Sequence, residues 1–268
     1  MTILPLLVAV GLSFSKYDML TNPTSVGWDN YTSLFSDPTF WTAIKNTLYF
    51  SLGQVPIGTI TALAVAVLLN QRFSGVNGVR VAVYLPQAAS FVVVSLVWTF
   101  MYDPQVGPLN QVIRGLGGDT VYWLTDSSLA MPSLIAMSIW RNLGYFMVIF
   151  LSALQSVPSS LLEAAAVDGA NTWQRFRHVT LPALRPATTF VVITWFLGAL
   201  QMFTQSYVMT GGGPVDATQT VVFRIYQEAF LNLNLGKASA IAVLLFIAVL
   251  VVAVPMRMYH AHSERRRR

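Results

Sequence analysis

The side chains that could carry out chemistry are few in this chain of 268 residues, and their spacing fits no familiar active site. The sequence contains no cysteine, so thiolate metal ligands and cysteine nucleophiles are excluded. His178, His260 and His262 have no carboxylate at a metal-binding spacing. No Gly-x-Ser-x-Gly nucleophile turn occurs either. We therefore expect a protein that catalyses no covalent reaction and binds no metal.

A phosphate-binding loop is also missing from the sequence. Such a loop needs glycine amides and a lysine around the phosphates, in the pattern Gly-x-x-x-x-Gly-Lys-Ser/Thr. The nearest match, Leu235-Gly236-Lys237-Ala238, lacks the first glycine and has alanine where Ser or Thr is required. We expect this chain to bind no cofactor.

Polar and aromatic side chains inside two long apolar stretches are candidates for binding a solute. Arg141 lies halfway along the stretch 129–155, where a charged side chain is costly and faces a helix bundle or a water-filled cavity. It could meet a solute, or it could pair with a carboxylate or with backbone carbonyls, and we favour this structural role. Aromatic rings and amides suit a sugar-like ligand, although the same groups join helices and mark membrane interfaces. The candidates for the solute path are Trp140, Arg141, Asn142, Tyr145, Trp195, Gln201, Phe203, Gln205 and Tyr207.

The elements that must position these side chains are membrane spans. The chain is 54% hydrophobic and only 10% charged, whereas a soluble domain has about 25% charged residues. A membrane-crossing helix needs roughly 20 mainly apolar residues. The sequence predicts an all-α membrane protein of about six transmembrane helices, with residues 1–268 as a single domain. The predicted spans are 43–69, 79–102, 129–155, 183–209 and 238–259, preceded by a short or shifted first span at 2–14.

The placement of Lys and Arg predicts the orientation. With both termini in the cytoplasm, ten of the 16 Lys and Arg residues fall on cytoplasmic segments and five on external ones, in agreement with the positive-inside rule. The terminal arginines at 265–268 suit a topology signal and an anionic-lipid anchor better than nucleic-acid binding. The first residues lack the basic region and cleavage site of a signal peptide, so we expect them in the mature protein.

A polar segment, EAAAVDGANTWQRF at residues 163–176, interrupts the apolar pattern on the predicted cytoplasmic side. Ser160 and Glu163 have the spacing of a capping box that would start a short helix. Gly169 suits the left-handed position that ends such a helix. These signals predict a first short helix that stops at a tight glycine turn.

The residues after this turn predict a second short helix. Asn171 or Thr172 could cap it, and Pro182 would end it. Its apolar residues could dock into a groove of another protein, or they could rest on the surface of this chain's own membrane. Both interpretations are compatible with the residues alone. The apolar face consists of Trp173, Phe176 and Val179.

The string EAAAVDGANTWQRFRHVTLP closely resembles the EAA motif of ABC-importer permeases. Three further strings are similar to the spans of carbohydrate-type permeases related to the maltose permease: WRNLGYFMVIFLSALQSVP at 140–158, YVMTGGGP at 207–214 and GKASAIAVLLF at 236–246. The resemblance covers most of the chain and implies the type I ABC importer permease fold, with a cytoplasmic coupling helix in the loop 158–182. These permeases usually have a basic leader before a full first span, and the first residues of this sequence differ from that pattern.

The resemblance also implies roles for individual residues, because the EAA segment of this family docks on a cytoplasmic ATPase subunit. Glu163 would pair with a basic group of the ATPase, and Gly169 would set the sharp turn. The residues implied in ATPase coupling are Glu163, Ala164, Ala165, Asp168, Gly169, Ala170, Trp173, Phe176, Leu181 and Pro182.

The function implied by the resemblance is that of the transmembrane subunit of an ATP-driven importer in the cytoplasmic membrane of a prokaryote. Its cargo would be a sugar or a sugar-like solute, such as a glycerol phosphate or its diester. The implied partners are a second homologous permease, two cytoplasmic ATPase subunits, an extracytoplasmic solute-binding protein and membrane lipid, without nucleic acid. The alternative is a self-sufficient secondary transporter or channel for a small polar solute. Such a protein usually carries ion-coupling carboxylates in its spans, and no Asp or Glu falls within the predicted spans.

Overall fold

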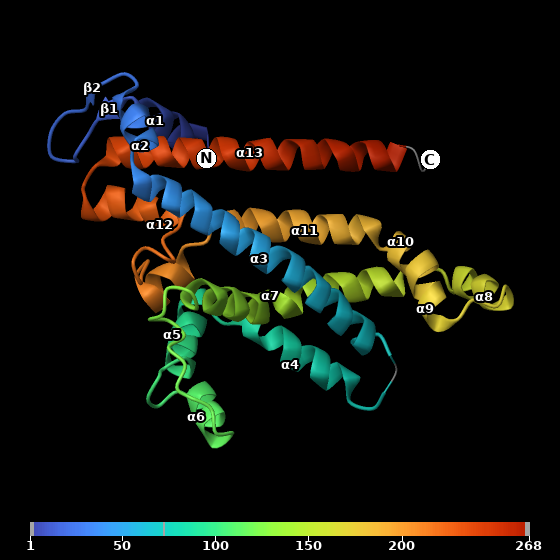
Figure 1. Ribbon diagram of the computed structural model, residues 1–268. Helices are drawn as coiled ribbons and strands as arrows, with labels where there is room; N and C mark the ends of the chain where they lie inside the picture. Colours follow the sequence, from blue (N-terminus) through green and yellow to red (C-terminus); the bar gives the residue numbers. More distant parts are fainter. Residues whose placement is uncertain (1–2, 72, 266–268) are drawn as a thin grey trace. The chain divides into compact units, whose positions relative to one another are not determined.

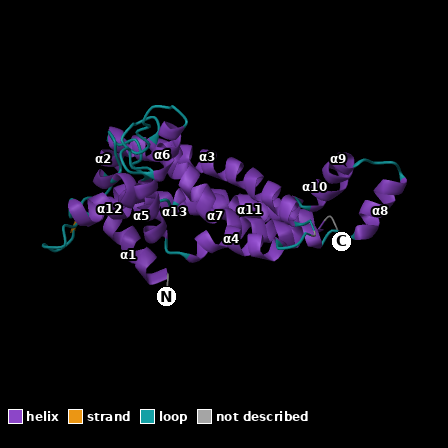
Figure 2. Cartoon of the chain, turned by 90° about the horizontal axis from the view of Figure 1, so that it is seen from below, coloured by secondary structure: helices purple, strands orange, loops and turns teal. Residues whose placement is uncertain are grey.

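Helices make up nearly all of the regular structure in the computed structural model (Figures 1 and 2), which describes residues 3–71 and 73–265, with side chains described as far as Val254. The first elements are α1 (Ile3–Ser13), β1 (Ser15–Lys16), β2 (Thr24–Ser25), α2 (Asp29–Phe35), α3 (Pro38–Leu69), α4 (Val76–Ala88), α5 (Phe91–Met101) and α6 (Pro108–Gly115). The middle elements are α7 (Ala130–Gln155), α8 (Ser159–Val167), α9 (Thr172–Arg175), the π-helical turn η1 (Phe176–Thr180), α10 (Leu181–Ala183) and α11 (Arg185–Leu200). The last elements are the π-helical turn η2 (Ser206–Thr210), α12 (Val221–Tyr226), the π-helical turn η3 (Gln227–Leu231) and α13 (Leu235–Arg265). The two short strands pair antiparallel, with Ser15 opposite Ser25.

The chain divides into two compact units, each assembled from separated stretches of sequence. The first unit contains residues 1–52, 91–135 and 197–268, and the second unit contains residues 53–90 and 136–196. Helices α3, α7 and α11 contribute residues to both units. That residues 1–268 form a single transmembrane domain stays a prediction.

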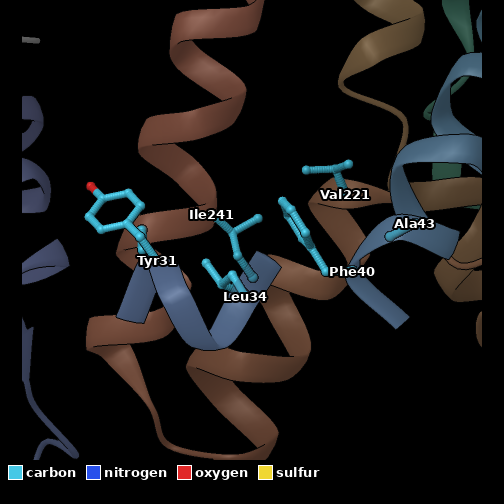
Figure 3. Packing of buried hydrophobic residues seen from close by; sticks show 7 residues of the cluster. Tyr31, Leu34, Phe40, Ala43, Val221 and Ile241 are labelled. Atoms are coloured by element: carbon cyan, nitrogen blue, oxygen red, sulfur yellow. The ribbon is translucent and has the colours of Figure 1, made fainter. Parts of the chain in front are cut away.

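A buried apolar cluster joins α2, α3, α12 and α13 in the first unit. Figure 3 shows Leu34 of α2 and Phe40 of α3 beside Ile241 of α13, with Val221 of α12 next to them. Leu34 and Ile241 are fully buried. Burying a side chain of this size contributes about 1.5–3 kcal/mol. Helix α13 also packs along α1, as Figure 1 shows, so segments from both ends of the sequence contact each other.

Four charged side chains form what we call the ionic cluster, also in the first unit. Oδ2 of Asp37 accepts hydrogen bonds from Nη2 of Arg224 at 2.9 Å and from Nζ of Lys237 at 3.3 Å. Oε1 of Glu228 lies 2.9 Å from the same Arg224 nitrogen and 3.7 Å from Nζ of Lys237. These side chains are only 4–18% exposed, so each charge depends on the others for compensation. Burial raises the pKa of Asp37, but hydrogen bonds from Thr39 and the charge of Arg224 outweigh this effect and lower it to about 2.

Glycine allows the helices of the second unit to pack closely. Gly144 of α7 lies against the backbone of α4 at Val83, where a Cβ atom would collide with the carbonyl oxygen. Gly58 of α3 likewise faces the indole ring of Trp195. That ring stacks on Phe146 with centroids 4.1 Å apart and planes 11° apart. Small residues at helix contacts are typical of membrane helices, because they let backbones approach.

Three helical segments are long and apolar enough to cross a membrane, judged by length and composition. They are α3, α7 and the part of α13 from Leu235 to Val254, and they confirm the predicted spans at 43–69, 129–155 and 238–259. Two bent pairs, α4 with α5 and α9–α10 with α11, would raise the number to five among the described residues. Helix α1 is apolar but has only 11 residues. The count of six spans stays a prediction, and the predicted role of the arginines at 265–268 lies outside the described side chains.

Two predicted spans are wrong as continuous helices. The span 79–102 is interrupted where Ala89 adopts an extended backbone, with φ −75° and ψ 149°, so α4 and α5 are separate helices. Pro86 weakens the last turn of α4, because proline lacks the amide that would bond to the preceding turn. The span 183–209 is interrupted after Leu200, where α11 ends before the turn η2.

Candidate functional site

The predicted helix–turn–helix around residues 163–176 is present in the second unit as a segment that we call the α8–α10 hairpin (residues 159–183). Figure 2 shows it extending beyond the ends of α4, α7 and α11. Gly169 has φ 82°, and its N–H donates to the carbonyl of Ala166 at 3.1 Å. The N–H of Ala170 donates to the carbonyl of Ala165 at 2.9 Å. This pair of bonds is the Schellman motif, and it confirms the predicted turn at Gly169.

The capping of the two short helices agrees with the prediction at one site and differs at the other. Oδ1 of Asn171 accepts from the N–H of Gln174 at 2.9 Å, and Oε1 of Gln174 accepts from the N–H of Asn171 at 2.8 Å. These bonds confirm the predicted cap at Asn171. The predicted capping box at Ser160 is wrong, because α8 already begins at Ser159 and its cap residue, Pro158, makes no side-chain cap bond. Ser160 therefore lies inside the first helical turn.

Pro182 does not end the second helix, contrary to the prediction. It is the second residue of α10, which continues directly from the π-helical turn η1. The axis bends by 63° between α9–α10 and α11, after Ala183.

The hairpin exposes large apolar side chains. Val167 is 88% exposed, Trp173 is 65% exposed and Leu161 is 51% exposed. The ring of Trp173 stacks on Phe176 with centroids 5.8 Å apart, which fixes its orientation. Exposed apolar side chains that gather on a short segment indicate an interaction site. The α8–α10 hairpin thus presents a preformed surface for another molecule.

Most residues predicted to couple to an ATPase are accessible on this hairpin. The exposed ones are Glu163, Ala164, Asp168, Gly169, Trp173 and Leu181. The partly buried ones are Ala165, Ala170, Phe176 and Pro182. Their role in coupling stays a prediction.

Arg141 of α7 binds the end of α4 within the second unit. Its Nη2 donates to the carbonyl oxygen of Ala89 at 3.1 Å, and its Nη1 donates to Oε1 of Gln87 at 2.9 Å. Nη1 also lies 3.1 Å from Oδ1 of Asn142. The last carbonyls of a helix lack helical partners and attract cations. This contact at the α4 break agrees with the structural role that the sequence favours for Arg141.

The remaining candidates for the solute path differ in accessibility. In the second unit, Trp195 is only 3% exposed and packs in the core, whereas Trp140 and Tyr145 are 43% and 37% exposed. In the first unit, Gln205 is buried and Gln201 is exposed. Phe203 and Tyr207 join a cluster of aromatic rings in the first unit. The candidates fall in two separate sets, and their part in a solute path stays a prediction.

Sequence reasoning missed several residues that the structure brings to these places. Gln87 meets Arg141 at the α4 break. Phe223, Tyr226 and Phe230 complete the aromatic cluster of the first unit. Their spacing of three and four residues, typical of one helix face, could have indicated them. Within the part of the chain that the structure describes, no three His, Cys, Asp or Glu side chains gather in a way that could hold a metal.

Long apolar helices, a helix break bonded by polar side chains and a protruding helical hairpin are the features that the chain offers for comparison with known membrane proteins. Residues 54–268 match the sequence profile of the binding-protein-dependent transport system inner membrane component, and the chain belongs to this family.

Two relatives illustrate the breadth of this family. The lactose transport system permease protein LacF of Rhizobium radiobacter is 37% identical over 211 residues, which cover 76% of this chain and 70% of LacF. The sn-glycerol-3-phosphate transport system permease protein UgpA of Yersinia pestis is 34% identical over 209 residues, which cover 78% of this chain and 70% of UgpA.

A solved structure supports the same fold. The chain is similar to a chain of a bacterial ABC transporter involved in the import of the acidic polysaccharide alginate, with a TM-score of 0.83 and 26% sequence identity. The match covers 99% of this chain and 90% of that chain. The protein therefore has the type I ABC importer permease fold and is a permease subunit of a binding-protein-dependent ABC transporter. These matches favour this interpretation over a self-sufficient transporter or channel.

Proposed function

We propose that the chain forms part of an importer for a sugar or a sugar-like solute, including a glycerol phosphate or its diester. The names of LacF, UgpA and the alginate transporter support this substrate class. ATP and Mg²⁺ bind to a separate ATPase subunit, which hydrolyses ATP, while this chain supplies the passage through the membrane.

The complete importer contains this chain, a second homologous permease, two cytoplasmic ATPase subunits and an extracytoplasmic solute-binding protein. The chain crosses the cytoplasmic membrane of a prokaryote several times, with both termini in the cytoplasm. The Lys and Arg distribution supports this orientation. In this orientation the α8–α10 hairpin lies on the cytoplasmic side, where an ATPase could reach it.

The observation that carries the proposal is the exposed surface of the hairpin. Trp173 and Val167 are largely exposed in the chain alone. Binding to a partner would bury their apolar surface, which is favourable. Glu163 is exposed on the first helix and is available to a basic group of the ATPase. Movement of the ATPases on ATP binding would then pull the hairpin and, through α11, change the access of the solute path.

Gly169 provides the test, because proline at this position keeps the segment polar but forbids its turn. Proline holds φ near −65°, far from the 82° of Gly169, and cannot donate to Ala166. In a complex reconstituted with its ATPases and binding protein, Gly169→Pro should abolish ATP-dependent solute uptake while ATP hydrolysis continues. Glu163→Lys should weaken coupling, and Glu163→Gln should weaken it less.

Gly117 offers a matched control for this test. It is exposed, has φ 83° and ends α6 through a similar turn, but it lies in a predicted external loop. Gly117→Pro should leave the coupling of hydrolysis to uptake intact. Normal uptake by Gly169→Pro would contradict the docking role, and uptake driven by an ion gradient in this chain alone would contradict the importer proposal.

A further inference from the structure

Five aromatic side chains gather in the first unit, at the chain segment after α11 and along α12 and η3. Neighbouring ring centroids lie 5.1–6.3 Å apart, within the range of favourable aromatic contacts. We call this group the aromatic platform. Its members are Phe203, Tyr207, Phe223, Tyr226 and Phe230.

The base of the platform is held rigidly. Phe223 is 3% exposed and packs on Gly212, where a Cβ atom would collide with the ring. The chain between these residues is fixed by buried hydrogen bonds. Oγ1 of Thr218 donates to the carbonyl of Gly213 at 2.8 Å, and Oγ of Ser206 donates to the carbonyl of Thr218 at 2.6 Å. A fixed base lowers the entropic cost of binding a ligand on the rings above it.

The outer rings of the platform are accessible and carry hydroxyl groups. Phe230 is 65% exposed and Tyr207 is 47% exposed. The hydroxyl of Tyr226 donates to the hydroxyl of Tyr207 at 3.4 Å, a long and exposed contact that a better partner could replace. The exposed large apolar side chains along the described part of α13 are mostly aliphatic, such as Ile247, Leu250 and Val251. The platform therefore has a chemical character of its own.

We propose that the aromatic platform binds a pyranose ring of the transported solute, an inference that rests on the proposed import of sugars. The faces of aromatic rings are negative, so they attract the weakly positive C–H bonds on the apolar face of a sugar. The phenolic hydroxyls of Tyr207 and Tyr226 supply hydrogen-bonding partners for the sugar hydroxyls at the rim. Apolar rings with a few well-placed polar groups are the usual composition of a small-molecule site.

Two plainer roles make different predictions. Tyr and Phe side chains also gather where membrane helices meet the headgroup region, and exposed rings can pack against a second permease chain. A headgroup belt would bind no sugar, and substitution of its rings would leave sugar binding unchanged. A permease interface would be covered in the assembled complex, so sugar would reach the platform in the isolated chain only.

The test is saturation-transfer NMR with the full chain in lipid nanodiscs, repeated with the assembled transporter, and with lactose as the probe. Tyr207→Leu and Phe230→Leu should each raise the lactose concentration for half-maximal transfer about tenfold, the upper range of a single aromatic contact. Tyr207→Phe keeps the ring and should raise it less. Phe35→Leu is the matched control, because Phe35 is an aromatic residue of the same unit with 51% exposure.

Glycerol 3-phosphate, which has no sugar ring, should give no transfer that depends on the platform. The proposal is overturned if lactose gives no transfer, if both Leu variants behave like the unmodified chain, or if the signal disappears in the assembled transporter. ATP-dependent uptake is measured separately on the same preparations. If ATP-dependent uptake persists in a transporter that does not bind lactose, the proposed sugar site on the aromatic platform is refuted and the importer function stands. If ATP-dependent uptake is absent, the proposed importer function is refuted.

Discussion

The ionic cluster of the first unit and the α8–α10 hairpin of the second unit are both polar regions of an apolar chain, but contacts of different range hold them in place. In the ionic cluster, Asp37 bonds Arg224 and Lys237, which are 187 and 200 residues away in the sequence. In the hairpin, the side-chain hydrogen bonds of Asn171, Arg175 and His178 join positions three or four apart in the sequence. The first region buries its charges, and the second exposes its apolar side chains.

This difference teaches that the two regions depend on different partners. The ionic cluster balances two negative and two positive charges within one chain, so it needs nothing further to remain buried. The hairpin has a cap at Asn171 and a turn at Gly169, but Trp173 and Val167 are largely exposed. Damage to the first region should therefore appear in the stability of the chain, and damage to the second in its coupling to other subunits.

The largest expected effect follows from breaking the ionic cluster. Arg224→Ala leaves the carboxylates of Asp37 and Glu228 buried with Lys237 as the remaining cation. Removing one partner of a buried ion pair costs about 3–5 kcal/mol. The melting temperature of the purified chain in detergent should fall clearly, and it should recover in part in Arg224→Lys. An unchanged melting temperature would mean that the cluster adds no stability.

The next prediction concerns the exposed apolar side chains of the α8–α10 hairpin. Trp173→Ala removes a large exposed ring from the hairpin, and loss of such an anchor from an interface costs about 2 kcal/mol, which is about 30-fold in affinity. The variant should bind its ATPase about 30-fold more weakly in a titration, with an unchanged melting temperature. Trp28→Ala is the matched control, since Trp28 is 67% exposed in the first unit and should leave ATPase affinity unchanged.

A smaller effect tests whether the hairpin is held locally. Asn171→Ala removes the cap of α9 and should destabilise that helix by about 1 kcal/mol. Amide hydrogen exchange at residues 172–176 should become about fivefold faster, without a change at α12. Asn171→Asp retains an acceptor at the cap and should exchange like the unmodified chain. Faster exchange in both units would show that the hairpin is tied to the rest of the fold.

A further effect of the ionic cluster depends on pH. The pKa of Asp37 is about 2 in the folded chain, below the value of about 3.9 for an unperturbed Asp. Its contribution to stability is therefore complete above about pH 4 and is lost as the pH falls from about 4 to 2. Over this range the melting temperature should fall more steeply for the unmodified chain than for Asp37→Asn. If the melting temperature fell equally steeply with pH in both chains, other carboxyl groups would be responsible for the acid sensitivity.

The sequence predicted the hairpin better than the ionic cluster, and the range of the contacts explains why. Gly169 and Asn171 reveal their roles through neighbours a few residues away. The helix α7 could be predicted as well, because the stretch from 130 to 155 is mainly apolar and long enough to span a membrane. The pairing of Asp37 with Arg224 depends on how distant helices pack, and no local pattern encodes it.

The α4 break shows a related limit. Residues 79–102 are mainly apolar, so composition favours one continuous span. Arg141, more than 50 residues further along the chain, stabilises the break. Its Nη2 donates a hydrogen bond to the carbonyl oxygen of Ala89. Arg141 thus makes a structural contact, and its part in a solute path stays a prediction. The aromatic platform, by contrast, contains three rings that were not singled out because they lie in a predicted loop.

The position of Asp37 has a consequence for exchanging parts between members of this family. The family match begins at residue 54, yet Asp37 and the buried residues Leu34 and Phe40 come before it and pack against Arg224 and Ile241. A chimaera joined at residue 54 would replace Asp37, Leu34 and Phe40 while it keeps their native partners on α12 and α13. Exchanges that transfer the first 53 residues together with the segment from 197 onwards keep these complementary surfaces matched.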